Sequence, residues 1–320
     1  MKPEELAGRN VLVTGATGFI GSHLVSALVS SGARVHAFAR ESSSLERLKA
    51  HGNAVTIHSG DITDRDSIEK CFRSANPEVV FHLAADLRAR HADPGLEKVE
   101  GIFGVNVTGT LNVVLAAASS ASVTKLVRTG SIGEYGHAAT PFDELDRELP
   151  SSPYAASLVA ATHLCQALQA LVSFELVTVR PALVYGPGQD QRFFIAQLIR
   201  SCLDGVDFEM TEGTQTRDFV YVSDIVAGLL VVATREGLDG EVLNLASGNG
   251  HALIDVAELV VRLTGSTSGI RRGARRASDS EARDLVSLTS RARKLLGWRA
   301  EVGLEEGLRR TIDFERSRRS

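Results

Sequence analysis

The sequence has few of the residues that build covalent or aromatic scaffolds. Its 320 residues include only 3 Cys, 2 Met and 1 Trp, and aromatic residues make up 5%. The three cysteines, Cys71, Cys165 and Cys202, are far apart, so no pair has the spacing of a zinc site and the odd count gives no disulfide framework. We predict that they are small buried apolar side chains.

Long hydrophobic runs and an excess of one charge are also missing. No run reaches the roughly 18 apolar residues of a transmembrane helix, and the first ten residues, MKPEELAGRN, lack the apolar stretch of a signal peptide. The formal net charge is −4, with no basic or acidic tail. Nucleic acids and membrane surfaces attract dense cationic faces, so we expect a cytoplasmic protein with neither as a partner.

Short apolar runs alternate with helical stretches through the first half of the chain. The runs are continuous and rich in Val, Leu and Ile, which is typical of strands buried on both faces of a parallel sheet. Strands are expected at Val11–Val13, Arg34–Phe38, Ala54–His58, Val79–Leu83, Lys125–Arg128 and Leu176–Val179, and helices at Phe19–Ser30, Ser44–Ala50, Asp64–Phe72, Val99–Ala118 and Pro153–Leu171. This order predicts an α/β fold with a doubly wound parallel (Rossmann) sheet.

The second half is less regular and predicts a smaller lobe. Helices are expected at Phe193–Leu203, Val222–Thr234, Ile254–Leu263 and Leu304–Phe314, short strands near Phe219–Val222 and Val242–Leu245, and a polar loop over Thr264–Asp284. We assign residues 1–180 and 218–247 to a dinucleotide-binding domain. Residues 181–217 and 248–320 then form a C-terminal substrate-binding lobe.

A glycine-rich turn follows the first expected strand. Gly15 permits the tight turn, Gly18 lets a pyrophosphate approach the backbone, and Gly21 allows close packing of the next helix. Free N–H groups at the start of that helix attract phosphates. Strand, spacing and helix occur in the right order, so the segment predicts a dinucleotide site.

The end of the second expected strand bears on the choice of dinucleotide. NAD-specific folds often place Asp or Glu there to hold the ribose 2′-hydroxyl, whereas this chain has Ala39 and Arg40. Arg40 could neutralise a 2′-phosphate. On this ground alone NADP stays open beside NAD.

Several motifs together resemble the extended short-chain dehydrogenases of the NAD-dependent epimerase/dehydratase family. They are Thr14–Gly21, Gly60–Ile62, Phe81–Ala85, Asn106–Thr110, Tyr185–Gln189, Arg217–Asp224 and Leu295–Trp298. The resemblance covers nearly the whole chain. It implies an NAD enzyme that acts on a nucleotide-diphosphate sugar, with a homodimer formed through the helices near Val99–Ala118 and Pro153–Leu171.

The resemblance also assigns site residues. Those expected to bind the cofactor are Gly15, Thr17, Gly18, Phe19, Ile20, Gly21, Arg40, Asp61, Ile62, Leu83, Ala84, Ala85, Tyr154 and Pro181. Arg217 and Arg276 are expected to clamp the substrate diphosphate, a geometry that guanidinium groups suit, and Gln189 to bind substrate beside them.

The reactive positions depart from the family pattern. Relatives carry Tyr and Lys four residues apart on one helical face, but here Tyr154 is followed at that distance by Leu158. Ser131 and Thr129 supply hydroxyls at the preceding strand end. A Tyr phenol has an ordinary pKa of about 10. A nearby ammonium stabilises the phenolate and lowers this pKa, so the loss of the Lys removes that stabilisation.

Further departures concern the acid and base of elimination. Dehydratases of the family carry Asp-Glu after the hydroxyl residue, whereas this chain has Ile132 and Gly133, with Glu134 one place later. Glu134 is therefore a candidate general acid or base, because a carboxylate in an apolar pocket has a raised pKa; a structural carboxylate is the alternative. Leu183 replaces a substrate-facing Asn of many relatives.

An intact binding scaffold with altered reactive positions points to an atypical member of the family. We expect dehydration of UDP-N-acetylglucosamine by 5,6-elimination through a transient 4-ketone, with Tyr154 taking the C4 hydroxyl proton. The alternatives are an NDP-sugar 4-epimerase, an NADP-dependent ketone reductase and a non-catalytic dinucleotide sensor.

Overall fold

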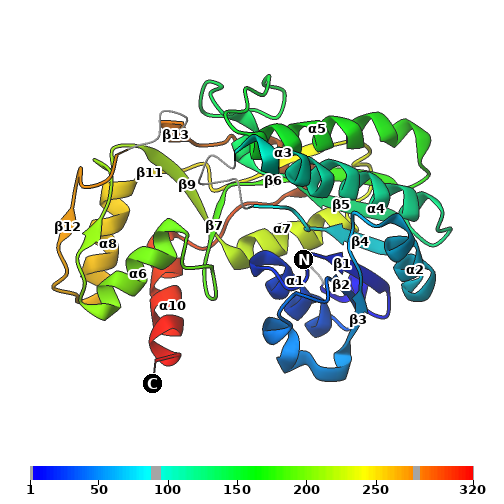
Figure 1. Ribbon diagram of the computed structural model, residues 1–320, viewed down its shortest axis with the longest axis horizontal. Helices are drawn as coiled ribbons and strands as arrows, with labels where there is room; N and C mark the ends of the chain where they lie inside the picture. Colours follow the sequence, from blue (N-terminus) through cyan, green and yellow to red (C-terminus); the bar gives the residue numbers. More distant parts are fainter. Residues whose placement is uncertain (1–2, 88–94, 277–281, 320) are drawn as a thin grey trace.

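A seven-stranded parallel sheet forms the centre of the larger domain (Figure 1). The structure, a computed structural model, describes residues 3–87, 95–276 and 282–319. The sheet order is β10-β6-β5-β4-β1-β2-β3, built from β1 (Asn10–Thr14), β2 (Arg34–Ala39), β3 (Val55–Ser59), β4 (Val79–His82), β5 (Lys125–Thr129), β6 (Glu175–Pro181) and β10 (Val242–Leu245). The predicted doubly wound sheet is confirmed. The strand order reverses between β1 and β4, and folds of this kind bind ligands in the crevice at that point.

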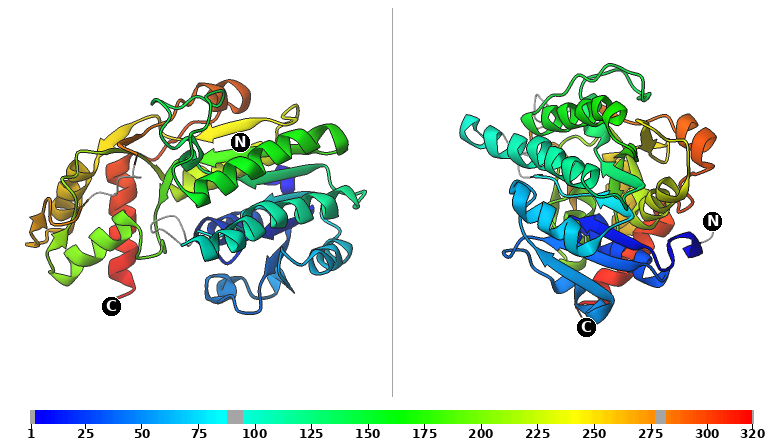
Figure 2. Two further views of the ribbon diagram at one scale, coloured as in Figure 1. Left: turned by 45° about the horizontal axis from the view of Figure 1, so that its top comes forward. Right: turned by 90° about the vertical axis from the view of Figure 1, so that its right-hand side faces the viewer.

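Helices cover both faces of this sheet (Figures 1 and 2). One face carries α1 (Phe19–Ser30) and α7 (Val222–Thr234), and the other carries α2 (Arg65–Ala75), α4 (Gly109–Ala118) and α5 (Pro153–Leu168). Short helical turns lie at η1 (Pro3–Leu6), η2 (Glu46–Ala54), η4 (Ile132–Tyr135) and η5 (Gln169–Leu171). All three cysteines are free and buried, as predicted.

The long helix expected at Val99–Ala118 is interrupted. It consists of α3 (Leu96–Phe103), a π-helical turn η3 (Gly104–Thr108) and α4, and π turns are frequent at functional sites. By length and composition, Leu96–Ala118 is the one helix in the described part of the chain that could cross a membrane, and half of its apolar window is buried. Its α4 portion contributes Val113, Val114 and Ala117 to the core beneath α2 and α5, which is the behaviour of a core helix.

The smaller lobe lies beside one end of the sheet (Figure 1), with the C-terminal helix packed into it. It contains α6 (Phe194–Asp204), α8 (Leu253–Thr264) and α10 (Leu304–Ser317), with the short strands β7 (Leu183–Tyr185), β8 (Phe208–Glu209), β9 (Thr216–Tyr221), β11 (Gly250–Ala252), β12 (Ile270–Arg271) and β13 (Asp284–Leu285). The segment expected to be loop, Thr264–Asp284, thus includes β12 and the start of β13.

The predicted lobe boundary differs from the packing in two places. Phe219 and Tyr221 of β9 were assigned to the larger domain but pack in the core of the smaller lobe. Helix α9 (Ser290–Leu296) was assigned to the lobe with the rest of 248–320, but Ala292, Leu296 and Trp298 join the core beside α7 and β10. The Trp298 ring N–H donates to the carbonyl of Asp224, at 3.1 Å. This stretch therefore belongs structurally to the larger domain.

His82, at the end of β4, makes the stability of the fold depend on pH. Its ring lies between the Thr14 hydroxyl at 2.7 Å and the Thr110 hydroxyl at 3.1 Å. Burial, assisted by the charge of Arg128, lowers the pKa of His82 from 6.5 to about 3. The unfolded chain therefore binds the proton more readily, and the stabilising contribution present above about pH 6.5 is lost as the pH falls toward about 3.

We expect the free energy of unfolding to fall by about 1.4 kcal/mol per pH unit from this group below about pH 6. Urea denaturation at several pH values measures the slope. In His82→Asn, which keeps a donor and an acceptor, the slope should be shallower by that amount. An equal slope in both proteins would show that His82 is not responsible.

Candidate functional site

A cavity of about 470 Å³ opens at the carboxyl ends of β1, β4, β5 and β6. Every residue predicted to bind the cofactor lines it, namely Gly15, Thr17, Gly18, Phe19, Ile20, Gly21, Arg40, Asp61, Ile62, Leu83, Ala84, Ala85, Tyr154 and Pro181. Thr129, Ser131 and Gln189 also lie on its wall. The volume is that of a ligand pocket, and the structure brings together residues that are up to 178 positions apart in the chain, Gly15 to Phe193.

The glycine turn is closely packed and needs glycine at Gly15 and Gly21. Gly15 has φ +71°, and a Cβ there would lie 2.7 Å from the Leu83 carbonyl carbon and the Ala84 nitrogen. A Cβ on Gly21 would lie 2.1 Å from the Gly15 carbonyl oxygen, so this glycine packs against the turn itself rather than against the sheet. Helix α1 begins after Gly18 with no side-chain cap and no acidic residue in its first turn, which suits an anionic group at its N-terminus.

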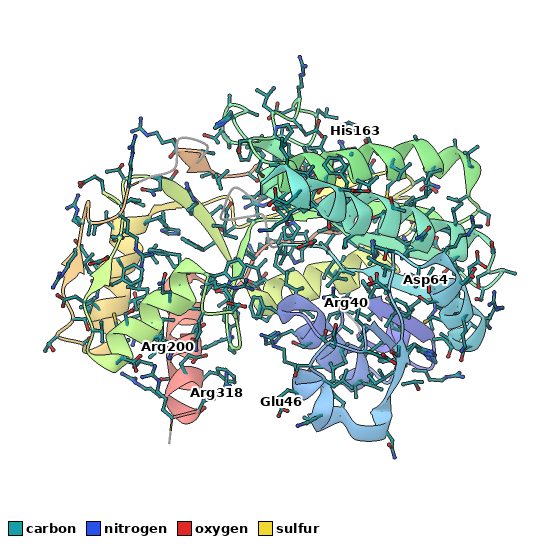
Figure 3. All side chains as sticks on the ribbon, viewed as in Figure 1. Arg40, Glu46, Asp64, His163, Arg200 and Arg318 are labelled. Carbon is teal, nitrogen blue, oxygen red and sulfur yellow. The ribbon has the colours of Figure 1, made fainter. Side chains whose placement is uncertain are left out.

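The adenosine end of the cavity lies beyond β2 and β3. An Asp61 carboxylate oxygen accepts from the Thr63 N–H at 2.9 Å and from its hydroxyl at 2.8 Å, and Ile62 packs on α4 near Gly109. Arg40, labelled in Figure 3, is exposed and lines the cavity directly after β2. The residues fit a dinucleotide. The positive charge of Arg40 could also neutralise a 2′-phosphate, so the site is compatible with NADP as well as NAD.

A second cavity of about 270 Å³ lies in the smaller lobe. It shares Val184, Gln189, Arg192 and Phe193 with the first cavity, so the two adjoin. Arg217 lines it and is held by donating to the carbonyls of Thr216 and Arg283, at 2.8 and 2.9 Å.

The structure places Arg275, the neighbour of the predicted Arg276, on the wall of the second cavity. Arg276 is exposed and is not among the residues lining either cavity, whereas Arg275 lines the second one. The Arg275 backbone N–H donates to the Met210 carbonyl at 3.1 Å, and its guanidinium lies 6.0 Å from the centre of the Phe208 ring. These contacts to Phe208 of β8 and to Met210, which follows it, turn Arg275 rather than its neighbour toward the cavity.

We expect Arg275→Ala to weaken UDP binding about tenfold or more, because a charge-assisted hydrogen bond to a phosphate contributes roughly 1.5–3 kcal/mol. Isothermal titration of the purified protein with UDP measures this without any turnover. Arg276→Ala is the matched control and should change the Kd by less than about twofold. If Arg276→Ala raised the Kd more than Arg275→Ala, Arg276 would be the residue that binds the diphosphate.

Tyr154 sits at the beginning of α5. The Ser152 hydroxyl caps this helix by accepting from the Ala155 N–H at 3.1 Å, and Pro153 occupies its first turn. Tyr154 and Leu158 are 6% and 2% exposed and form a small apolar cluster with Ile102. Both line the cavity, so the place of the usual ammonium is taken by an aliphatic side chain.

The expected apolar pocket around Glu134 does not exist. Glu134 is fully buried and absent from the cavity wall. One of its carboxylate oxygens accepts from the Ser131 N–H at 3.0 Å, and the other from the Thr162 hydroxyl at 2.7 Å and from Arg180 at 2.9 Å. Its interpretation as a general acid or base is therefore corrected, because the carboxylate has charged and polar partners and no access to a ligand.

Glu134 instead belongs to a buried charge network beneath Ser131. Arg180 also pairs with Glu148 at 2.6 Å, and Arg128 donates to the Thr162 hydroxyl at 2.9 Å. Burial lowers the pKa of Arg180, but the Glu134 charge and the Glu148 hydrogen bond outweigh it and raise that pKa. The network ties the Ser131 turn to α5 and β6, two elements that supply cavity residues.

Two residues of the site were missed by sequence reasoning. Asp86 follows directly on Leu83–Ala85, is 7% exposed and lines the cavity. Asn106, in the π turn, accepts from the Asp86 N–H at 2.7 Å. A carboxylate shortly after a buried parallel strand was a usable signal for Asp86, whereas the motif Asn106–Thr110 did not reveal that Asn106 contacts the Asp86 backbone.

The two lobes are joined by hydrogen bonds across the rim of the larger cavity. The His23 ring contacts the Pro187 carbonyl at 2.9 Å. Arg47 donates to the carbonyl of Thr17, in the glycine turn, at 3.2 Å, and to that of Gly188, in the lobe, at 2.7 Å. The segment after β7 is therefore held against the N-terminal part of the larger domain.

Comparison with known proteins agrees with this arrangement. The profile of the NAD dependent epimerase/dehydratase family matches residues 11–246. The dTDP-D-glucose 4,6-dehydratase of Homo sapiens is 29% identical, over 96% of this chain and 90% of its own length.

Two solved structures superpose over almost the whole chain. MoeE5 in complex with UDP-glucuronic acid and NAD is 32% identical with a TM-score of 0.84, covering 97% of this chain and 99% of its own. The UDP-N-acetylglucosamine 4-epimerase of Methanobrevibacter ruminantium M1, in complex with UDP-N-acetylmuramic acid, is 25% identical with a TM-score of 0.88, covering 98% and 99%. Similarity to these proteins extends through both the sheet and the smaller lobe.

Proposed function

Because the chain belongs to the NAD dependent epimerase/dehydratase family, we propose that it dehydrates UDP-N-acetylglucosamine by 5,6-elimination through a transient 4-ketone. One observation carries this proposal: Tyr154 and Ser131 line a dinucleotide cavity that adjoins an arginine-lined cavity in the smaller lobe. The first cavity suits NAD and the second suits a sugar diphosphate. A similar protein binds a UDP-sugar together with NAD.

Tyr154 is the proposed base for the C4 hydroxyl. The residues that line the first cavity would hold NAD, which when bound would supply reversible hydride transfer at C4 without being consumed. Tyr154 receives the hydroxyl proton, and Ser131 and Thr129 orient the hydroxyl. The positive end of the α5 dipole lies beside Tyr154 and favours the anionic phenolate, which offsets part of the loss of a lysine at Leu158.

An NDP-sugar 4-epimerase is the second candidate. Ile132 and Gly133 stand where the dehydratases have their Asp-Glu pair, and Glu134 is buried away from the cavity. A 4-epimerase needs no such pair, because hydride returns to the other face of the same ketone. The UDP-N-acetylglucosamine 4-epimerase among the similar structures favours the same alternative.

Incubation with UDP-N-acetylglucosamine followed by mass spectrometry tests the proposal. We expect a product lighter by one water and no net reduction of NAD. A product of unchanged mass with an altered sugar would instead establish the epimerase. Stoichiometric consumption of NADPH would indicate a ketone reductase, and tight NAD binding without any turnover a sensor.

We further propose a cytoplasmic homodimer that pairs α3, α4 and α5 with their copies. The support is the exposed apolar side chain of Leu96, at the start of α3, which is 91% exposed. Sedimentation equilibrium tests the assembly, and a monomer at micromolar concentration would reject it.

A further inference from the structure

We propose that Asp86 is the catalytic carboxylate that moves the proton in the elimination step. The inference rests on the proposed dehydration and extends it by naming the group that this step requires. Asp86 lies in the segment that leaves β4, and it lines the larger cavity with Leu83, Ala84 and Ala85.

The protein holds Asp86 at the same end of the cavity as Tyr154. The Asn106 side chain accepts from the Asp86 N–H at 2.7 Å and donates to the Ser157 hydroxyl at 2.8 Å. The Ser157 hydroxyl in turn donates to the Tyr154 carbonyl at 2.7 Å. Three short hydrogen bonds therefore connect the backbone of Asp86 to the backbone of Tyr154, and all four residues are buried.

The other carboxylates are in the wrong places. Among the described residues that line the two cavities, only Asp61, Asp86 and Glu209 carry one. Asp61 follows β3, whose only partner in the sheet is β2, at the adenosine end, and Glu209 lies on β8 in the smaller lobe. Asp86 follows β4, which is the neighbour of β5, the strand that leads to Ser131.

The chemistry needs one group that acts first as a base and then as an acid. Once C4 is a ketone, the C5 proton is acidic, and the Asp86 carboxylate takes it. The electron pair of the broken C5–H bond forms the C5–C6 double bond as the C6–O bond breaks. Protonated Asp86 then gives the proton to the departing hydroxyl, so that water leaves and the carboxylate is regenerated.

Asp86→Asn tests this assignment with the whole protein loaded with NAD. We expect formation of the dehydrated product to fall about 10²- to 10⁴-fold, the usual contribution of a general acid–base group. Oxidation at C4 should persist, so that sugar addition produces the absorbance of reduced nicotinamide without product. Asp86→Glu, which keeps the acid, should recover part of the rate, and Asp239→Asn, an exposed carboxylate outside both cavities, should match the wild type.

The possible outcomes separate the two proposals. If the wild type dehydrates the sugar and Asp86→Asn does so equally fast, the assignment of Asp86 is wrong while the function stands. If the wild type only epimerises the sugar, dehydration is wrong and Asp86 has no C5 proton to move. Loss of product together with loss of nicotinamide reduction and of NAD binding in both Asp86 variants would make Asp86 structural and overturn the proposal.

Discussion

Replacing Tyr154 with phenylalanine is expected to lower kcat about a thousandfold, since removal of a positioned base costs roughly 10²- to 10⁴-fold. The phenol lines the cavity at the start of α5 and is 6% exposed, so the substitution removes one hydroxyl and leaves the packing with Leu158 and Ile102 in place. Conversion of UDP-N-acetylglucosamine, followed by mass spectrometry under saturating sugar, measures the effect.

The control for this experiment is a second tyrosine. Tyr221 is similarly buried, in the core of the smaller lobe, but lines neither cavity. We expect Tyr221→Phe to keep kcat within about twofold, in line with the small effect of most substitutions away from special features. The Kd values for UDP and NAD should remain unchanged in Tyr154→Phe. Undiminished turnover in this variant would show that another group takes the C4 proton.

Glu134→Ala is expected to destabilise the protein by about 3–5 kcal/mol, the usual cost of breaking a buried ion pair by removing one partner. Glu134 is fully buried and accepts from the Ser131 N–H, the Thr162 hydroxyl and Arg180. Without it, Arg180 keeps Glu148 as its only carboxylate partner among the described residues. Urea denaturation at neutral pH measures the free energy of unfolding.

An exposed carboxylate provides the comparison. Glu301 pairs with Arg299 on the surface, at 3.0 Å, with two thirds of each side chain exposed. Pairs of this kind contribute at most about 1 kcal/mol, so Glu301→Ala should have a small effect. If both variants lost the same small amount, the network beneath Ser131 would not be a stabilising feature.

The parts of the fold that sequence predicted were those encoded by local pattern. Continuous Val, Leu and Ile runs gave all six N-terminal strands, and the bounds of α1 and α7 match the expected ranges. The glycine turn predicted the cavity because its spacing is a local pattern, although the steric demand on Gly15 comes from Leu83 and Ala84, in the segment that follows β4. The same local reasoning missed α9. Its sequence SRARKLL contains three cationic residues and too few apolar residues to show helical periodicity.

The errors concern contacts between distant segments. Nothing near Glu134 in the chain reveals that Arg180, 46 positions later, lies against it. The placement of Arg275 rather than Arg276 on the cavity wall depends on contacts of Arg275 with Phe208 and Met210, more than 60 positions earlier in the chain. The hydrogen bond from the Asp86 N–H to Asn106 likewise joins segments 20 positions apart.

The single side chain of Arg47 spans the mouth of the dinucleotide cavity from one lobe to the other. Any separation of the lobes at this rim must break at least one of its two hydrogen bonds. The same separation would also break the contact between the His23 ring and the Pro187 carbonyl, so the rim of the dinucleotide cavity cannot open without freeing the segment that leads into the sugar subsite.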